Sequence, residues 1–164
     1  MSERTIDELD RVILNILQEN GRISNAEIAR QVGKAPSAVL ERVRKLERKG
    51  FITGYEAVVD QNKVGRKLTA FTMVFTDEPA GSFETGRELA KIPEVLEVHY
   101  TAGQAPYLVK VRVESTEDLQ RILARFGAIP TVRDTNSTIV LTTVKESRGI
   151  PVAPETVTNG DEPH

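Results

Sequence analysis

Apolar residues in the first 50 positions recur every three or four residues, the period of an α-helix that is buried on one side. The first stripe predicts a helix from about Thr5 to Glu19, ended by Asn20-Gly21, and consists of Ile6, Leu9, Val12, Ile13, Ile16 and Leu17. A second, short helix follows Ser24, because Ser24-Asn25-Ala26-Glu27 has the S-x-x-E form of a capping box. Gly33 is expected to end this helix.

A third helix is predicted from Pro36, since a proline in the first helical turn has no N–H that would need a partner. Its apolar stripe runs down to Gly50 and consists of Val39, Leu40, Val43 and Leu46. Glu47 falls at the edge of the stripe, where we expect it to pair with Arg44. A tight turn, Gly33-Lys34-Ala35, joins the second and third helices, and a β-rich run at 57–59 follows. This order predicts a helix-turn-helix with a β-wing.

Beyond Asp60 the hydrophobic period changes from 3.6 to 2, which is typical of β-strands. Strands are predicted over residues 68–76, 95–101, 107–113 and 138–144. Ser82 is expected to cap a helix that runs to Ile92, and Ser115 to cap one that ends at Gly127. The order βαββαβ predicts a ferredoxin-like sandwich, so the fold class is α+β: a winged helix-turn-helix followed by this sandwich.

The predicted elements divide the chain into four parts. Residues 1–53 form the helical domain, 54–67 a β-rich linker, 68–147 the sandwich, and 148–164 a disordered tail with three prolines and no periodicity. Several strands carry apolar residues on both faces. A second copy of the chain is the simplest cover for the face without helices.

Charge is unevenly distributed along the chain, although the net charge is only −2. The segment from Lys34 to Gly50 holds six basic residues and two acidic ones. A local basic helix on an acidic carrier is typical of a DNA-reading element. The alternative is an ordinary solvated basic face.

Absent residue types limit the chemistry. The chain has no cysteine, which excludes disulfides and thiolate metal sites, and it starts without an apolar targeting or membrane-spanning segment, so we expect a cytoplasmic protein. Only His164 could join His99 at a metal, so no metal or cofactor is expected. Without a nucleophile and base pair, an enzyme is not expected either.

Three segments resemble the Lrp/AsnC family of transcription factors. The stretch GRISNAEIARQVGKAPSAVLERVRKLERKGFITGYEAVVD resembles the family's DNA-binding half, and EVLEVHYTAGQAPYLVKVRV and TVRDTNSTIVLTTVKES resemble sheet segments of its effector-binding and assembly domain. The resemblance implies a homodimer made by pairing two sheets, often assembled into tetramers or octamers. It also implies an amino acid or related metabolite bound between subunits.

The DNA-binding residues are expected on the outward side of the third helix and beside it. Ser37, Ala38 and Glu41 would read bases, Ala38 by a thymine methyl and Glu41 by a cytosine amino group. Phosphates would be met by Lys34, Arg42, Lys45 and Arg48. The family usually has Ser or Thr where this chain has Ala35, which leaves a backbone amide free for a phosphate. Asn25, at the start of the second helix, is either a further phosphate contact or a simple capping-region residue.

The effector site is expected at the loop between the second and third strands, together with two residues near the last strand. These residues are Ala102, Gly103, Gln104, Ala105, Pro106, Tyr107, Thr135 and Ser137. The family loop typically reads Gly-Asp-aromatic-Asp-Tyr, and both acidic residues are absent here. Two interpretations stay open: a metabolite-modulated regulator, and a ligand-independent, architectural DNA-binding oligomer in which the loop is a plain hairpin connection.

Overall fold

The computed structural model describes residues 6–147 and 149–153, which form two compact units. One unit contains the described residues up to Val58 together with those from Lys145 onward. The other unit is Val59–Val144. The chain therefore leaves the first unit, builds the second, and returns to the first.

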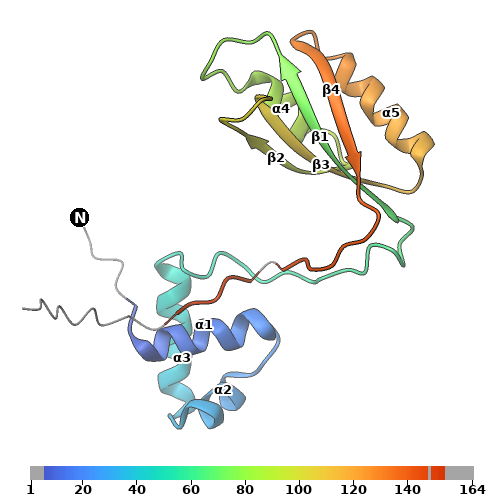
Figure 1. The fold of residues 1–164 in the computed structure, drawn as a ribbon. Helices are drawn as coiled ribbons and strands as arrows, with labels where there is room; N and C mark the ends of the chain where they lie inside the picture. The colour runs from blue at the N-terminus through green and yellow to red at the C-terminus, as the bar shows by residue number, and fades with distance from the viewer. Residues whose placement is uncertain (1–5, 148, 154–164) are drawn as a thin grey trace, which may run out of the picture. The chain divides into compact units, whose positions relative to one another are not determined.

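Three helices make up the first unit: α1 (Glu8–Glu19), α2 (Asn25–Val32) and α3 (Pro36–Arg48) (Figure 1). Their apolar stripes meet in a small core of Ile13, Leu14, Ile28, Ala29, Val39, Val43 and Leu46. The predicted helix-turn-helix is thus confirmed. α1 begins at Glu8 rather than near Thr5, because the Asp7 side chain caps the Asp10 amide and the Asp10 side chain accepts from the Asp7 amide.

The turn between α2 and α3 follows its sequence signals. Ser24 Oγ accepts from the Glu27 amide at 3.1 Å, and Gly33 ends α2 in the left-handed conformation (φ 64°) that glycine adopts without steric cost. The second half of the predicted capping box does not form, since Glu27 instead accepts from Arg30 at 2.7 Å. Ala35 takes the N-cap position of α3 with no side-chain hydrogen bond.

The predicted β-wing is not formed. Residues 49–67 contain no strand, although Ala57, Val58 and Val59 are β-rich in sequence. A wing needs two strands that pair, and only one β-rich run follows α3. Tyr55 instead contacts α3, where its hydroxyl donates to Glu47 Oε1 at 3.0 Å. This hydrogen bond takes the place of the expected pair between Glu47 and Arg44.

The second unit is one antiparallel sheet with two helices on one face, as predicted (Figure 1). Its four strands are β1 (Leu68–Thr76), β2 (Val95–Tyr100), β3 (Tyr107–Val113) and β4 (Val132–Ile139). They lie side by side in the sheet in the order β2-β3-β1-β4. The helices are α4 (Glu84–Ala90) and α5 (Thr116–Gly127). Ser115 caps α5 as expected, by accepting from the Asp118 amide at 3.2 Å.

Alternation along the strands separates the two faces of the sheet. The helix-covered face holds the core, with Ala70, Val74, Val109, Val111 and Val113 fully buried. The opposite face carries Phe71, Met73, Phe75 and Leu108, and Phe71 is 38% exposed. Beside them, His99 Nε2 and Lys110 Nζ each lie 3.2 Å from a Glu97 carboxylate oxygen. The open face is therefore apolar along β1 and charged toward β2.

Gly86 in α4 is required by close packing. A Cβ atom at this position would lie 2.7 Å from a ring carbon of Tyr107, which is itself 2% exposed. Glycine lowers helix propensity, but at this position it leaves the space that the buried Tyr107 ring occupies.

The last strand lies earlier than predicted. β4 covers Val132–Ile139 instead of residues 138–144, and Leu141 and Val144 beyond it are each 95% exposed. β4 is an edge strand that buries little, so its sequence is polar and lacks the apolar alternation on which the prediction depended.

Two further expectations are corrected. α4 is preceded by Phe83 rather than capped by Ser82, and the Glu78 carboxylate accepts from the Thr85 amide at 3.1 Å in the role of a cap. Residues 149–153, predicted to be disordered, are hydrogen-bonded to α1. Residues 154–164 of that tail lie outside the described residues.

Candidate DNA-binding surface and effector region

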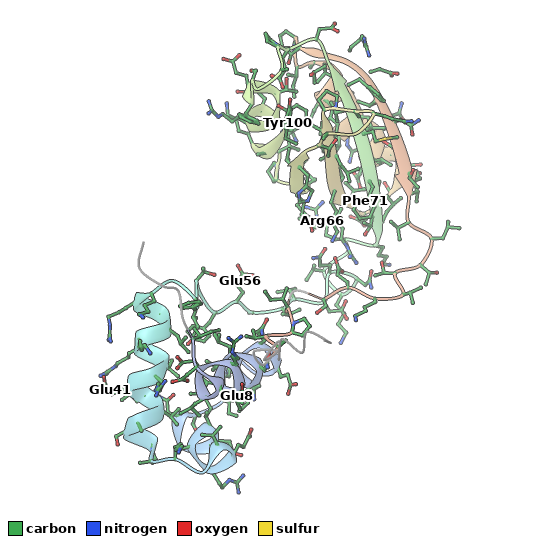
Figure 2. The ribbon with its side chains drawn as sticks, turned by 60° about the vertical axis from the view of Figure 1, so that its left-hand side comes forward. Glu8, Glu41, Glu56, Arg66, Phe71 and Tyr100 are labelled. Atoms are coloured by element: carbon green, nitrogen blue, oxygen red, sulfur yellow. The ribbon has the colours of Figure 1, made fainter. Side chains whose placement is uncertain are left out.

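The exposed side of α3 is set by its buried stripe. At 100° per residue, Val39, Val43 and Leu46 define one side, and the opposite side carries Ser37, Glu41, Arg44 and Arg48 at spacings of four, three and four. All four are exposed, and Glu41 projects from α3 away from the other two helices (Figure 2). We call these four residues the α3 stripe.

The residues expected at the N-terminal end of α3 are accessible. Lys34, Ala35 and Ala38 are all exposed beside Ser37. No side chain caps the helix at Ala35, and helix N-termini attract phosphates through their backbone amides. Asn25, at the first position of α2, is half-buried.

Arg42 and Lys45 face α1 instead of lying on the α3 stripe. The Asp10 side chain is fully buried, and its two carboxylate oxygens lie 3.1 Å from Arg42 Nη1 and 3.5 Å from Lys45 Nζ. Arg42 also donates to Asp7. A buried carboxylate needs such partners, because burial without them is costly. Arg42 and Lys45 thus stabilise the packing of α3 against α1 through their ion pairs with Asp10.

The pKa values of Asp7 and Arg42 show that opposite charges stabilise this contact between α1 and α3. The Asp10 amide, and then the Arg42 guanidinium, hold the pKa of Asp7 below its usual value. The hydrogen bonds to Asp7 and Asp10 raise the pKa of Arg42, which therefore stays charged. The α1 terminus and the middle of α3 are joined by opposite charges.

Sequence reasoning missed Arg44. Its side chain is 57% exposed and lies 3.7 Å from Glu41 Oε1, a surface ion pair of the kind that contributes little to stability. The signal that would have found it is the spacing 37–41–44–48, read against the centre of the buried stripe instead of residue by residue.

The loop proposed for an effector is closed by its own hydrogen bonds. Thr101 Oγ1 donates to the Ala105 carbonyl at 2.5 Å, and the Thr101 amide donates to the Pro106 carbonyl at 2.8 Å. Ala105 is 3% exposed, whereas Ala102, Gly103 and Gln104 at the tip are exposed.

The two expected residues of the last strand lie on the helix-covered face. Tyr107, Val74 and Thr135 face one another in a row across β3, β1 and β4, which puts Thr135 about 10 Å from Tyr107 at two strand spacings. Ser137 lies in the next row, and its hydroxyl is bonded to Thr72 Oγ1 at 2.8 Å. The structure therefore brings Tyr107 and Thr135 to the same end of the sheet. The Ser137 hydroxyl is instead used in its hydrogen bond with Thr72.

Glu78, just after β1, was not found from the sequence. Its carboxylate accepts from the Tyr107 hydroxyl, from Ser82 Oγ at 3.2 Å and from the Thr85 amide. Burial alone would raise the pKa of Glu78, but these hydrogen bonds hold it below its usual value. Burial first, and then the Glu78 carboxylate, raise the pKa of Tyr107 to about 12. An acidic group therefore does lie next to the loop, supplied by another segment.

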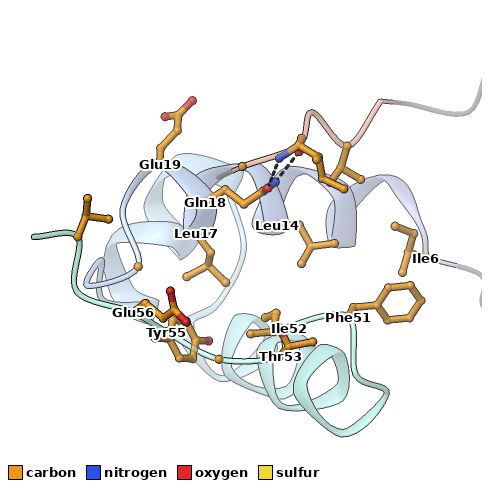
Figure 3. A pocket seen from close by; sticks show the side chains of 16 residues that line it. Ile6, Leu14, Leu17, Gln18, Glu19, Phe51, Ile52, Thr53, Tyr55 and Glu56 are labelled. Atoms are coloured by element: carbon orange, nitrogen blue, oxygen red, sulfur yellow. Dashed lines mark hydrogen bonds between the residues drawn. The ribbon is translucent and has the colours of Figure 1, made fainter. Parts of the chain in front are cut away.

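An open groove of about 750 Å³ lies within the helical unit (Figure 3). Leu14, Leu17, Phe51 and Ile52 line it, together with Ile150 from the C-terminal segment.

Within residues 6–147 and 149–153, no helix is long and apolar enough to cross a membrane, and no group of three or more acidic or histidine side chains could hold a metal ion.

Two family models match successive parts of the chain. Residues 6–53 match a winged helix-turn-helix DNA-binding model, and residues 69–150 match the Lrp/AsnC ligand binding domain. The HTH-type transcriptional regulator FL11 of Pyrococcus horikoshii is 38% identical over 90% of this chain and 97% of its own length. The chain belongs to the Lrp/AsnC family of transcriptional regulators.

Other Lrp/AsnC proteins support this assignment. The leucine-responsive regulatory protein of Escherichia coli K12 is 37% identical over 88% of this chain and 90% of its own. The transcriptional regulator NMB0573 of Neisseria meningitidis, solved as a complex with L-methionine, superposes with a TM-score of 0.85 at 30% identity, over 90% of this chain and 97% of its own. The predicted family, α+β fold and regulator function are thereby confirmed.

Proposed function

We propose that this Lrp/AsnC regulator reads a specific DNA sequence with the α3 stripe and that a small metabolite bound in the sheet unit modulates it. The observation that carries the proposal is the stripe itself: four exposed polar side chains at helical spacing, two of them arginines, on the helix that follows the tight turn. We expect it to act in the cytoplasm, without enzymatic activity.

The roles divide by position along α3. Ser37, Ala38 and Glu41 lie toward the N-terminal end of the helix, the part that meets base edges in helix-turn-helix proteins. Arg44 and Arg48 from the stripe and the exposed Lys34 then meet phosphates, which supply affinity without sequence information. The uncapped amide region at Ala35 and the side chain of Asn25 are further phosphate contacts. Arg42 and Lys45 hold α3 in place through Asp10.

Selection from random duplexes tests base reading by Glu41. The full-length protein is expected to enrich one motif, and Glu41→Gln to change the preferred base pair at one position, because a carboxylate only accepts hydrogen bonds. Glu8→Gln, an exposed change of the same kind on α1, is the matched control and should keep the original motif. If the unchanged protein enriches no motif, or Glu41→Gln enriches the same one, the proposed reading is wrong.

We further propose that the open face of the sheet pairs with a second copy, with tetramers or octamers built from such dimers. Phe71, Met73, Phe75 and Leu108 give this face an apolar centre, and exposed apolar patches of this kind mark association sites. Glu97 and Lys110 form its charged side, with His99 beside Glu97.

The effector is expected to be an amino acid or related metabolite held near Tyr107 and Thr135 and the loop tip at Gln104. Support comes from the Neisseria relative, which was solved with L-methionine. The competing proposal is a ligand-independent architectural protein, favoured by the absence of both acidic loop residues. A thermal-shift screen of amino acids separates the two. A ligand of the folded state at 100 times its Kd adds about 2.7 kcal/mol of stability, whereas an architectural protein shows no shift with any of them.

A further inference from the structure

A short extended segment, Gly149–Ala153, lies along α1 and belongs to the same compact unit (Figure 3). The Ile150 amide donates to Gln18 Oε1 at 2.8 Å, and Gln18 Nε2 donates back to the Ile150 carbonyl at 2.9 Å. Two residues further along, the Val152 amide donates to Asn15 Oδ1 at 3.0 Å, and Asn15 Nδ2 donates to the Val152 carbonyl at 3.1 Å. Arg11 completes the set with a bond of 2.8 Å to the Ala153 carbonyl.

The helix presents these side chains as a ladder. Residues 11, 15 and 18 follow the four-and-three spacing that places side chains on one face of a helix. An amide group carries both a donor and an acceptor, so it can pair with the N–H and the C=O of one residue, as a neighbouring strand does. Asn15 and Gln18 lie about 4.5 Å apart along the helix axis, and alternate residues of an extended chain about 6.6 Å, a difference that flexible side chains can span.

The sequence of the segment suits this pairing. Pro151, which has no N–H, falls between the two residues whose amides are used. Proline also favours an extended conformation in itself and in the residue before it, which lowers the entropy lost on docking. Val152 packs against the core of the helical unit, while the Ile150 side chain stays 73% exposed.

We propose that the Arg11, Asn15 and Gln18 face of α1 is a docking site for an extended peptide read through its main chain, and that its occupant is the chain's own segment 149–153. Docking turns the stretch after β4 into a second connection between the units, alongside residues 54–67. It also adds apolar cover to a helical unit whose core contains only seven buried apolar residues among those described.

Main-chain reading defines what the site accepts. The side chain at position 150 is free to vary, proline is tolerated at 151, and a medium-sized apolar residue is needed at 152. Ile150→Lys is therefore expected to leave docking intact, whereas Val152→Asp releases the segment because it places a charge against the core.

Disulfide trapping tests the proposal directly, since the chain has no cysteine of its own. A Cβ atom on Gly149 would lie 3.6 Å from the Cβ of Gln18, within the range that a disulfide requires. Full-length Gln18→Cys/Gly149→Cys loses the Gln18 amide but keeps the contacts of Arg11 and Asn15, so it is expected to form an intrachain bond under mild oxidation, seen as a monomer about 2 Da lighter by mass spectrometry. Glu19→Cys/Gly149→Cys, one residue along α1, is the matched control and should remain largely reduced.

Two outcomes would overturn the proposal. A covalent dimer from the Gln18→Cys/Gly149→Cys pair would mean that the segment docks on another copy. Equal oxidation of both pairs would mean that it does not dock at a defined place.

Hydrogen exchange tests the ladder without cysteines. The amides of Ile150 and Val152 should exchange at least about tenfold more slowly than in a free peptide, and Asn15→Ala with Gln18→Ala should abolish this protection, because alanine has no side-chain oxygen to accept from these amides. Gln120→Ala, an exposed change on α5, should leave the protection intact. Unprotected amides in the unchanged protein, or protection that survives both substitutions, would contradict main-chain reading.

Discussion

Replacing Arg42 with alanine is expected to destabilise the helical unit while leaving the salt dependence of DNA binding unchanged. The Asp10 carboxylate that it contacts is fully buried, and removing one partner of a buried ion pair costs about 3–5 kcal/mol. Here Lys45 remains 3.5 Å away and the Arg42 side chain is 32% exposed, so we expect a smaller loss of about 1–2 kcal/mol. Each kcal/mol lowers the Tm of a domain of this size by roughly 4–8 °C.

Arg44→Ala is the matched substitution, because it removes the same group from the same helix at a 57% exposed position. It should leave the Tm unchanged and reduce the magnitude of the negative slope of log K against log salt by about one unit, as expected for one lost phosphate contact. The assays are thermal unfolding of the full-length variants and DNA titrations between low and moderate salt. If Arg42→Ala lowered the slope by a unit with an unchanged Tm, Arg42 would be a phosphate contact and the bracing role would be wrong.

Three further predictions concern the sheet unit. Gly86→Ala should lower the urea midpoint, because crowding the Tyr107 ring costs about 1–3 kcal/mol against a gain of up to about 1 kcal/mol in helix propensity; a higher midpoint would contradict the packing argument. The raised pKa of Tyr107 means that stability is fully present below pH 10 and is lost as the pH rises toward about 12, by about 1.4 kcal/mol per pH unit; Tyr107→Phe should remove this dependence in alkaline unfolding titrations, and an unchanged profile would show that another group is responsible. Phe71→Arg should shift the protein toward monomer in sedimentation, while Phe83→Arg, also at an exposed phenylalanine, should not; equal behaviour of the two would contradict pairing through the open face.

Much of the fold could be predicted because local signals and packing agree. The central strand β3 buries one face completely and β1 buries the middle of one face, so their alternation is strong and their predicted bounds are correct. The edge strand β4 has little to bury, and the apolar run after it, including Leu141, was mistaken for the strand. A wing was predicted from one β-rich run, although pairing depends on a partner that sequence alone does not show.

The exposed side of α3 could be predicted from the sequence, but the contacts of each side chain on the helix could not. Arg42 turns inward to the buried Asp10 on α1, a contact between two helices that the spacing along α3 does not reveal, whereas Arg44 lies on the exposed side. Glu78 could not be found, since its partner Tyr107 is 29 residues away. Likewise, the pairing of Gln18 with Ile150 spans 132 residues and leaves no local pattern.

The most direct test of DNA reading by α3 is a competition between two duplexes at moderate salt. The unlabelled competitor is either the selected motif or the same bases in scrambled order, so both carry the same phosphate charge. If α3 reads bases, the motif binds at least about 1,000-fold more tightly than the scrambled duplex. A ratio near one would mean that the α3 stripe supplies charge alone and that α3 does not read bases.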